Sequence, residues 1–228
     1  MTVSALLTQI YLAYRGKGSA RVPAFGTDKS NDMLAIANRK KNEWATDPNN
    51  KWASLFENRL ISVIDYTDTT YDLPDDFYQP SDFARIVDLN DSIYDYPIVK
   101  PQQRNNFSKS VYISGRQPNK IATFAQEINS SLDGGSLYIP GYYIPVDMAL
   151  EADIVSVDYP EWLVYIVASE LSRNDPAKDD QYVNLVNQAN DVYRKMVEAN
   201  SSVGFMQPNK IMSNMGSIGD AYSEDWLN

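Results

Sequence analysis

Apolar residues recur at helical spacing at the start of the chain and again after residue 27. In the first segment they lie three or four positions apart, as one face of a helix requires: Val3, Leu6, Leu7, Ile10, Tyr11 and Tyr14. Gly16 and Gly18 follow, and glycine commonly ends helices. From Asp28 to Ala45 the apolar stripe is thinner and the other face is basic at residues 39–41. The pattern predicts two N-terminal helices, the second of which covers a core without filling it.

Between residues 59 and 159 the hydrophobic period shortens from that of a helix to that of a strand. Clusters of Pro, Gly, Asn and Asp separate the alternating segments, and Asp133-Gly134-Gly135 has the composition of a hairpin turn. The segments that read as strands are 59–66, 84–89, 111–114, 121–125, 137–139 and 154–159. We therefore expect a small antiparallel β region of five or six strands.

Helical periodicity returns after the β region. Asp158 and Glu161 have the spacing of a capping box, and Pro160 falls in the first turn, where its missing N–H costs nothing. The helix that follows is apolar on most sides, so we expect it to be the buried one. A break at residues 174–176 precedes a final amphipathic helix over about 179–200. The short link between these two helices predicts that they pack antiparallel.

Together these segments predict an α+β fold. The N- and C-terminal helices form an α-helical bundle, a small antiparallel β domain is inserted between them, and an extended C-terminal arm ends the chain. The expected boundaries are residues 1–58 for the N-terminal helices, 59–157 for the β-rich insertion, 158–200 for the C-terminal helical hairpin and 201–228 for the arm.

The chain contains no cysteine and no histidine. Disulfides, thiolate nucleophiles and cysteine-based metal sites are therefore excluded, as are histidine-containing catalytic triads and imidazole metal ligands. Carboxylate, lysine or tyrosine chemistry is all that is left for an enzyme. We expect no catalytic residue, no cofactor and no metal.

The chain is acidic, with 30 Asp and Glu against 20 Lys and Arg and a formal net charge of −10. Such a balance disfavours unspecific binding to nucleic acid, which needs clustered basic residues. Residues 1–50 carry +3, whereas residues 51–100 and 151–200 carry −6 each. This asymmetry would suit a subunit whose basic helix meets an acidic copy of itself, and an ordinary acidic surface is the alternative. Apolar runs are too short for a membrane helix, so no membrane partner is expected.

Two groups of residues could serve a carbohydrate ligand. Paired carboxylates cleave glycosides, and one segment is crowded with aspartates: Asp68, Asp72, Asp75, Asp76 and Asp82. Asp and Pro are also the usual residues of solvated turns, and we favour that interpretation here. Tyrosines of the β region could form a sugar platform, although cross-strand pairs and interfaces are more usual: Tyr94, Tyr96, Tyr138, Tyr142, Tyr143 and Tyr159.

Three segments together resemble a known family. They are Tyr71-Asp72-Leu73-Pro74-Asp75-Asp76-Phe77, then Tyr159-Pro160-Glu161-Trp162 leading through the following helix into Asn174-Asp175, and Ala189-Asn190-Asp191-Val192-Tyr193-Arg194-Lys195-Met196. The pattern over about residues 28–200 resembles the head-to-tail adaptor, or connector, proteins of tailed bacteriophages, among them the podophage tail tubular A-like adaptors. The resemblance is strongest over 158–200, and the N-terminal stretch matches poorly.

The resemblance implies a structural virion protein of the neck and tail, assembled in the host cytoplasm. Such subunits form a homo-oligomeric ring, commonly a dodecamer, that joins the capsid portal protein to a downstream tail or nozzle protein. DNA passes through the lumen without specific binding, and no enzymatic step is needed. The alternatives are a carbohydrate-binding or carbohydrate-cleaving phage tail component and an intracellular scaffold unrelated to phage.

The last segment of the chain is polar but keeps apolar residues at near-helical spacing. One interpretation is a floppy terminus, or an arm folded onto its own domain; the other is an arm that becomes ordered on a partner. The resemblance implies that this segment docks on the portal. The candidate partner-binding residues are Phe205, Met206, Ile211, Met212, Met215, Ile218, Tyr222 and Trp226.

Overall fold

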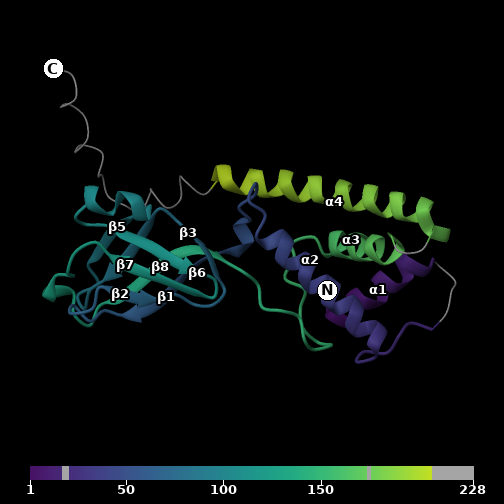
Figure 1. Ribbon diagram of the computed structural model, residues 1–228, viewed down its shortest axis with the longest axis horizontal. Coiled ribbons are helices and arrows are strands. Elements are labelled where there is room, and N and C mark those ends of the chain that lie inside the picture. Colours follow the sequence, from purple (N-terminus) through teal and green to yellow (C-terminus); the bar gives the residue numbers. More distant parts are fainter. Residues whose placement is uncertain (17–20, 174–175, 207–228) are drawn as a thin grey trace, which may run out of the picture.

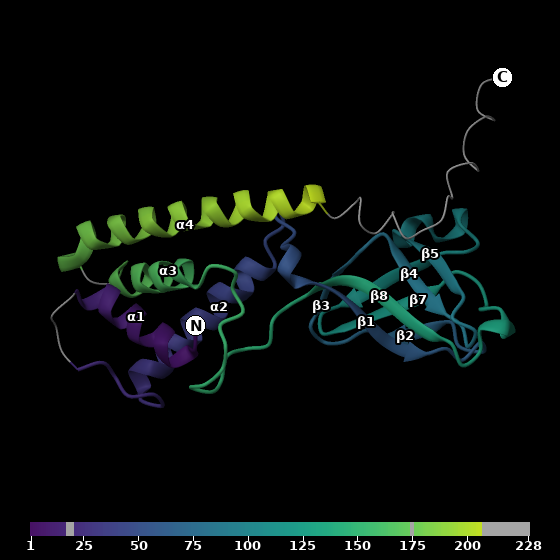
Figure 2. The same cartoon turned by 180° about the vertical axis from the view of Figure 1, so that it is seen from behind.

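The computed structural model describes residues 1–16, 21–173 and 176–206. The molecule is elongated, with helices at one end and strands at the other (Figure 1; Figure 2 shows it from behind). The helical unit consists of α1 (Val3–Arg15), α2 (Asp28–Ala45), α3 (Pro160–Arg173) and α4 (Asp179–Met206). The chain leaves it after α2 and returns to it at α3. The return segment, residues 144–159, is called the connector below.

The sheet unit lies between α2 and α3 in the sequence. Its strands are β1 (Phe56–Val63), β2 (Thr70–Asp72), β3 (Phe77–Pro80), β4 (Phe83–Val87), β5 (Ile93–Val99), β6 (Val111–Arg116), β7 (Asn119–Phe124) and β8 (Ser136–Tyr143). Short 3₁₀ turns flank them: η1 (Ala53–Leu55), η2 (Pro101–Asn106) and η3 (Ser130–Leu132), while η4 (Pro176–Lys178) precedes α4.

The strands form one sheet in the order β1-β8-β4-β5-β6-β7-β2, and β3 also pairs with β8. The sheet curls into a nearly closed, barrel-like shape with β1 and β2 at its two ends. Every pairing between these strands is antiparallel except that of β5 with β6, which is parallel and covers only the pairs Ile98–Val111 and Val99–Tyr112. A parallel pair cannot be joined by a tight turn, which is why η2 and the residues after it run back along the sheet.

Alternating side chains of β4 and β8 fill the interior of the sheet unit. Ala84, Ile86, Leu137 and Ile139 are fully buried, whereas the alternate residues Phe83, Arg85, Val87, Ser136 and Tyr138 are partly exposed. Phe77 of β3 adds an aromatic ring that meets Tyr143 edge to face at 5.4 Å between centroids.

Glycine at position 141 of β8 allows β3 to approach so closely. A Cβ atom there would lie 2.6 Å from the Gln79 carbonyl oxygen and 2.9 Å from the Phe77 ring. Any larger residue would therefore push β3 away from β8.

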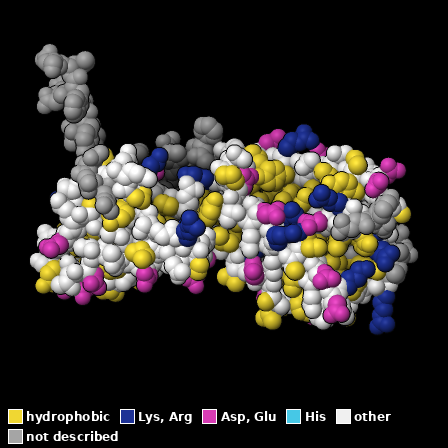
Figure 3. Space-filling view, in the orientation of Figure 1, with side chains coloured by type: hydrophobic (Ala, Val, Ile, Leu, Met, Phe, Trp, Pro, Cys, Tyr) yellow, Lys and Arg dark blue, Asp and Glu magenta, His cyan; other side chains and the backbone are white. Residues whose placement is uncertain are grey.

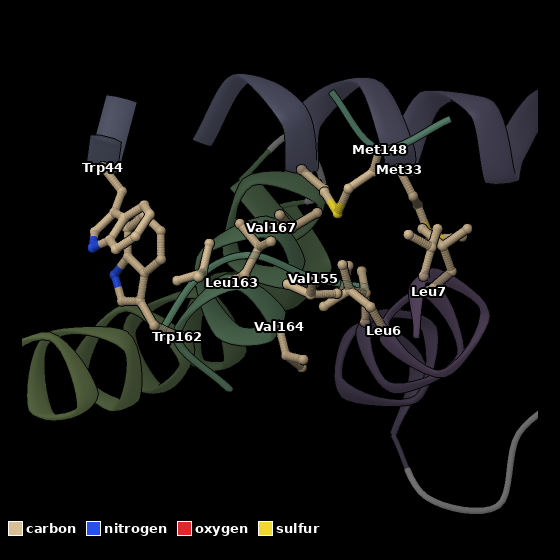
Figure 4. Close-up of a cluster of buried hydrophobic side chains, with 14 of the residues drawn as sticks. Leu6, Leu7, Met33, Trp44, Met148, Val155, Trp162, Leu163, Val164 and Val167 are labelled. Atoms are coloured by element: carbon tan, nitrogen blue, oxygen red, sulfur yellow. The ribbon is translucent and has the colours of Figure 1, made fainter. Parts of the chain in front are cut away.

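The core of the helical unit is built around α3, which packs against α1, α2 and α4. Figure 4 shows side chains from α1, α2, α3 and the connector meeting in one cluster: Leu6, Leu7, Met33, Trp44, Met148, Val155, Trp162, Leu163, Val164 and Val167. The expectation that the helix after Pro160 is the buried one is confirmed, since buried residues line several of its sides.

Two helix ends show how the helical unit is joined. Lys178 Nζ donates to the Tyr14 carbonyl at 2.7 Å, and Gln181 Nε2 donates to the carbonyls of Ala13 and Tyr14, so the start of α4 caps the end of α1. Helix α3 begins at Pro160, so Tyr159 and not Asp158 directly precedes it, and Asp158 accepts a hydrogen bond from the Ser54 hydroxyl at 3.0 Å. Helix α4 continues to Met206 rather than ending at about Asn200.

The expected fold class is wrong. The sequence pattern predicted a helical bundle carrying a small inserted antiparallel β domain, whereas the structure is built mostly on a nearly closed, barrel-like sheet, with the helices beside it. The sheet is larger than expected because β2, β3 and β5 were not predicted as strands. Asp72, Pro80, Asp95 and Pro97 lie in these three strands, and such residues are typical of turns.

The predicted strand at residues 154–159 is also wrong. Only an isolated bridge between Ile154 and Thr2 forms there. Val155 and Val157 alternate with exposed residues as they would in a strand, but they pack into the helical core instead. The alternation of apolar and polar residues over 154–159 therefore predicted correctly which side chains are buried, but it did not indicate a strand.

Candidate assembly surfaces

Large apolar side chains remain exposed at one end of the sheet unit. Four residues stand side by side across four neighbouring strands, in the order Val63 (β1), Ser136 (β8), Val87 (β4) and Ile93 (β5). Their side chains therefore form one row across the sheet. Because Leu137 and Ile86 point into the core, this row lies on the outer side of the sheet. Val63 and Ile93 are both more than half exposed, at 59% and 55%.

Three turns converge at this end and are called the sheet tip: residues 64–69, 88–92 and 129–135. The Ile64 amide donates to the Gly135 carbonyl at 2.7 Å, and the Gly134 amide donates to the Ile64 carbonyl at 2.9 Å. Leu89 is 78% exposed, and its Cδ1 would lie 3.6 Å from a Cβ atom on Gly134. Backbone hydrogen bonds thus join the turn at 64–69 to the turn at 129–135, and the Leu89 side chain of the turn at 88–92 lies against Gly134.

The sheet tip is acidic and has no basic residue in its three turns. Its carboxylates are Asp65, Asp68, Asp88, Asp91 and Asp133. The amides of Ser92 and Asn90 both donate to Asp88 at 2.8 Å, and they lower its pKa. The hydroxyl and amide of Thr67 do the same for Asp65 at 2.7 and 2.9 Å. These two side chains therefore stay ionised at neutral pH.

The connector also exposes large apolar side chains, those of Val146, Leu150 and Ile154. Val146 is 83% exposed, and the other two are about two-thirds exposed at 66% and 67%. The carboxylate of Asp153 fixes this loop, because the amides of Ala149 and Leu150 both donate to its Oδ2 atom, at 2.8 and 2.7 Å. The loop is therefore held in a defined shape with its apolar side chains outward.

Helix α2 holds the start of the connector through a buried lysine. Lys41 is fully buried, and its Nζ donates to the carbonyls of Pro145 and Val146 and to Asp147 at 2.7–2.9 Å. Burial lowers the pKa of Lys41, while Asp147 acts in the opposite direction. One turn earlier, Asn38 pairs with both backbone groups of Met148 at 2.9 Å. The three hydrogen bonds use all three donors of the Lys41 ammonium group. We call this set of hydrogen bonds from Lys41 to residues 145–147 the clamp.

The basic face predicted on α2 is engaged within the chain. Arg39 and Lys40 both form ion pairs with Glu170 of α3, and Lys41 is enclosed as described above. A contact of these cations with an acidic copy was one of two interpretations of the charge pattern; in the structure the cations tie α2 to α3 and to the connector.

The aspartates considered for glycoside chemistry do not converge. Asp76 forms an ion pair with Arg59 at 2.7 Å, and Asp68, Asp72, Asp75 and Asp82 are exposed in separate turns and strands. Among residues 1–16, 21–173 and 176–206, no group of three acidic side chains lies close enough to hold a metal ion.

The tyrosines considered as a sugar platform are dispersed. Tyr143 is buried, with the Arg59 guanidinium over its ring, and Tyr142 packs on Phe56. Tyr138 lies between Leu60 of β1 and Arg85 of β4 in the sheet register. Only Tyr94 and Tyr96 share a hollow, an open pocket of about 160 Å³ that borders the sheet tip. Tyr159 packs against the core of the helical unit.

The predicted partner-binding residues fall at or beyond the end of the described chain. Phe205 and Met206 belong to the last turn of α4. The other six lie outside the described residues: Ile211, Met212, Met215, Ile218, Tyr222 and Trp226. The sheet tip and the connector surface were not anticipated from the sequence.

The sequence itself shows that acidic and basic residues are separated within the sheet unit. Residues 96–126 contain five basic residues and no acidic one, whereas residues 64–95 contain nine acidic residues and a single arginine. Windows of 50 residues average across this boundary and hide it. On the face shown in Figure 3, acidic side chains follow the lower edge of the sheet unit and basic ones lie above them.

No helix within the described ranges combines the length and the apolar character needed to cross a membrane. No protein-family model matches this sequence, and no curated protein matches it at a significant level.

Proposed function

We propose that this chain is a structural subunit that assembles with copies of itself into a ring, and that the ring joins the capsid portal of a tailed bacteriophage to its tail. The observation that carries the proposal is the presence of two separate exposed apolar surfaces on one subunit, the sheet tip and the connector. Contiguous exposed apolar side chains are typical of protein interfaces.

The two surfaces are far apart. Ser136 at the start of β8 lies beside the sheet tip, and Tyr143 at its end leads into the connector. A strand of eight residues is about 27 Å long at roughly 3.4 Å per residue. A single partner surface of ordinary size would therefore not cover both, and each subunit offers two contacts.

Charge favours contacts between unlike surfaces. The sheet tip carries five carboxylates, and the connector carries Asp147, Glu151, Asp153 and Asp158. A two-fold symmetric contact would place either surface against its own copy and bring like charges together, which is destabilising. Because the tip and the connector are both acidic, each of them would have to meet a third, less acidic surface of the next copy. Such a contact is heterologous, and a heterologous contact that closes on itself forms a ring.

The acidic character of the subunit suits a passage for DNA. A ring of subunits that each carry −10 is strongly acidic, so a lumen lined by such subunits does not retain a duplex by unspecific contacts. Screening limits this repulsion to about 8 Å at physiological salt, so it acts at close approach.

The mass of the purified protein tests the ring directly. We expect sedimentation or native mass spectrometry to show a closed oligomer, alone or after addition of a portal protein. Replacing Val146 and Leu150 by serine should weaken assembly without unfolding the subunit, because both side chains are exposed. Val183→Ser, which removes an exposed valine from α4, is the matched control. A wild-type chain that stays a monomer at all concentrations, with and without portal, contradicts the proposal.

The predicted role of the C-terminal segment has its own test. The resemblance to adaptor proteins places portal docking in that segment, and deletion of residues 207–228 removes six of its eight candidate residues. We expect the truncated protein to keep its fold and its ring but to lose the portal in a co-sedimentation assay. Retained portal binding would rule out this role.

A further inference from the structure

Two tyrosines face the interior of the sheet unit without being covered by it. Tyr94 pairs with Ile86 and Tyr96 pairs with Ala84 in the antiparallel register of β4 and β5, so the side chains of each pair point to the same side of the sheet. Ile86 and Ala84 are fully buried, whereas Tyr94 is 41% exposed. The interior of the barrel-like sheet is therefore open beside β5, at the end next to the sheet tip.

This opening is the pocket of about 160 Å³, and part of its lining is aromatic. Phe124 of β7 lines it together with the two tyrosines, and the Phe124 ring meets that of Tyr96 edge to face at 5.3 Å between centroids. Because Phe124 is itself buried, this contact holds the ring of Tyr96 in place. Tyr94 is the most exposed of the three rings, so it is the one that a ligand can cover.

Most of the remaining lining is polar. The Ala125 amide donates to the Ser110 carbonyl at 2.9 Å, so the segment before β6 and the segment after β7 lie side by side. They bring the exposed side chains of Lys109, Gln126 and Glu127 to the pocket. Within the described part of the chain, none of these three side chains makes a hydrogen bond or an ion pair. The pocket therefore offers an ammonium group, a carboxamide and a carboxylate that the fold itself leaves unused.

The chemistry of this lining matches a sugar ring. A pyranose has faces of C–H bonds, which stack on the electron-rich face of an aromatic ring, and hydroxyls at its edge, which both donate and accept hydrogen bonds. An aromatic ring beside a carboxylate, an ammonium group and a carboxamide can use both features at once. The pocket is smaller than the about 300–1,000 Å³ of sites for drug-sized ligands, so it has room for one ring and not for several.

The charges around the pocket favour a neutral ligand. Glu127 and the five carboxylates of the adjoining sheet tip disfavour an anion, and Lys109 disfavours a cation. A neutral ring meets neither penalty, because its hydroxyls can donate to Glu127 and accept from Lys109. Glu127 is also the single carboxylate among the described residues that line the pocket, so the pair of carboxylates that glycoside cleavage needs is missing.

We propose that this pocket binds one neutral hexopyranose unit of a glycan, stacked on Tyr94, and that it binds the sugar without cleaving it. Glu127, Gln126 and Lys109 hold the hydroxyls of the sugar, and Tyr94 covers one of its C–H faces. The inference goes beyond the proposed ring and does not depend on it, since every residue of the lining belongs to one chain.

Titration of the full-length protein with single sugars tests the site. The probes are D-glucose, D-galactose, D-mannose and N-acetyl-D-glucosamine, and saturation-transfer NMR detects binding on the signals of the sugar, whether the protein is a monomer or a ring. We expect at least one of the four sugars to bind with a dissociation constant on the order of 1–10 mM, because a ligand of so few atoms binds weakly.

Two variants and two controls locate the bound sugar. Tyr94→Ala removes the exposed ring and Glu127→Ala removes the hydrogen-bond acceptor, so each should raise the dissociation constant about tenfold. Tyr66→Ala is the matched control for the first, because Tyr66 is 43% exposed and does not line the pocket. Glu198→Ala, at an exposed position of α4, is the control for the second. Both controls should bind like the wild type, and circular dichroism confirms folding of every variant.

Four results would overturn the inference. Absence of saturation transfer to all four sugars in the wild type would remove the site. Equal weakening by Tyr66→Ala and Tyr94→Ala would place the sugar elsewhere on the molecule. Tighter binding of free L-serine than of every sugar, lost in Glu127→Ala, would assign the pocket to a zwitterionic ligand. Hydrolysis of an aryl hexoside by the wild type, lost in Glu127→Ala, would replace binding by cleavage. None of these results bears on the ring, which is measured by mass.

Discussion

The helical unit and the sheet unit differ in where they leave large apolar side chains. Among the described residues of the four helices, only Leu12 and Val183 are large exposed apolar side chains, and the connector that packs on these helices exposes Val146, Leu150 and Ile154. The sheet unit exposes many more: Leu60, Val63, Tyr66, Leu89, Ile93, Tyr94 and Phe107. Both units nevertheless have a continuous buried core. The difference therefore lies not in a poorly filled interior but mainly in the outer surface of the sheet, whereas beside the helices most of the exposed large apolar side chains belong to the connector.

The two units also treat charge differently. The helical unit encloses one ammonium group, Lys41, and satisfies it with two carbonyls and a carboxylate. Among the described residues of the sheet unit, the buried polar side chain is the neutral Ser110, and its charges lie on the surface. The helical unit thus uses a buried charge to hold itself together, whereas the sheet unit keeps its ion pairs, such as Arg59–Asp76 and Arg85–Asp95, nearer the surface.

Truncating one side chain in each core should have the largest effect and shows whether the units are independent. Leu163→Ala and Ile86→Ala each remove a fully buried aliphatic group, so each should lower the free energy of unfolding by about 2–5 kcal/mol. Because the two residues belong to different clusters, loss of amide protection in hydrogen exchange should concentrate in the unit that carries the substitution. Equal loss in both units would mean that they unfold as one.

Substitution of Lys41 tests the claim that charge holds the helical unit together. Lys41→Met keeps most of the side-chain volume but leaves the carbonyls of Pro145 and Val146 without their donor. We expect a loss of about 1–3 kcal/mol in chemical denaturation. Arg39→Ala removes an exposed ion pair from the same helix and should cost less than about 1 kcal/mol. A loss for Lys41→Met no greater than that for Arg39→Ala would show that the clamp contributes little.

Alkaline titration compares a tyrosine from each unit. Burial raises the pKa of Tyr143 to about 12, and burial together with a hydrogen bond to Asp47 raises the pKa of Tyr193 to about 12. An unfolded tyrosine titrates near 10, so between pH 10 and 12 the unfolded chain releases protons that the folded chain retains. Stability contributed by each tyrosine is complete below pH 10 and falls as pH rises through 12.

The measurement is the free energy of unfolding at several alkaline pH values. With allowance for solvent screening, each tyrosine should account for about 1–2 kcal/mol of the loss. Tyr143→Phe and Tyr193→Phe should each make the decline shallower. An unchanged slope in both variants would contradict the assignment of the raised pKa values.

The smallest effect on stability is expected at the sheet tip. Leu89 is 78% exposed, so Leu89→Ser should change the free energy of unfolding by less than about 0.5 kcal/mol. The same substitution should nevertheless weaken assembly, because it removes the main apolar group of the tip. A large loss of stability would place Leu89 among the structural residues instead of the contact residues.

The helical unit was largely predictable from local pattern. The stripe from Val3 to Tyr14 matches α1, and five of its six residues are buried. Residues 28–45 form α2 as expected. In these segments the 3.6-residue period alone decides which side chains face the core. The burial of Lys41 could not be predicted, because its acceptors are supplied by residues about a hundred positions later.

The sheet unit was harder to predict because pairing decides its structure. Strand β5 contains Asp95 and Pro97, which argue for a loop, yet it is held in the sheet because residues 93–97 pair with β4 and residues 98–99 pair with β6. The sheet tip is assembled from three turns that are separated in sequence by about twenty and forty residues. Each turn could be recognised by its own composition, but only the register of β1, β4 and β8 brings the three together.

The placement of the sheet unit inside the helical sequence determines the order of events during synthesis. Helices α1 and α2 leave the ribosome early, but the helix that completes their core begins at Pro160. At roughly 5–20 residues per second, α1 and α2 wait on the order of ten seconds with their apolar stripes uncovered. The barrel-like sheet can close during this interval, so the nascent chain reaches its helical core last, after the surface proposed to receive another copy has already formed.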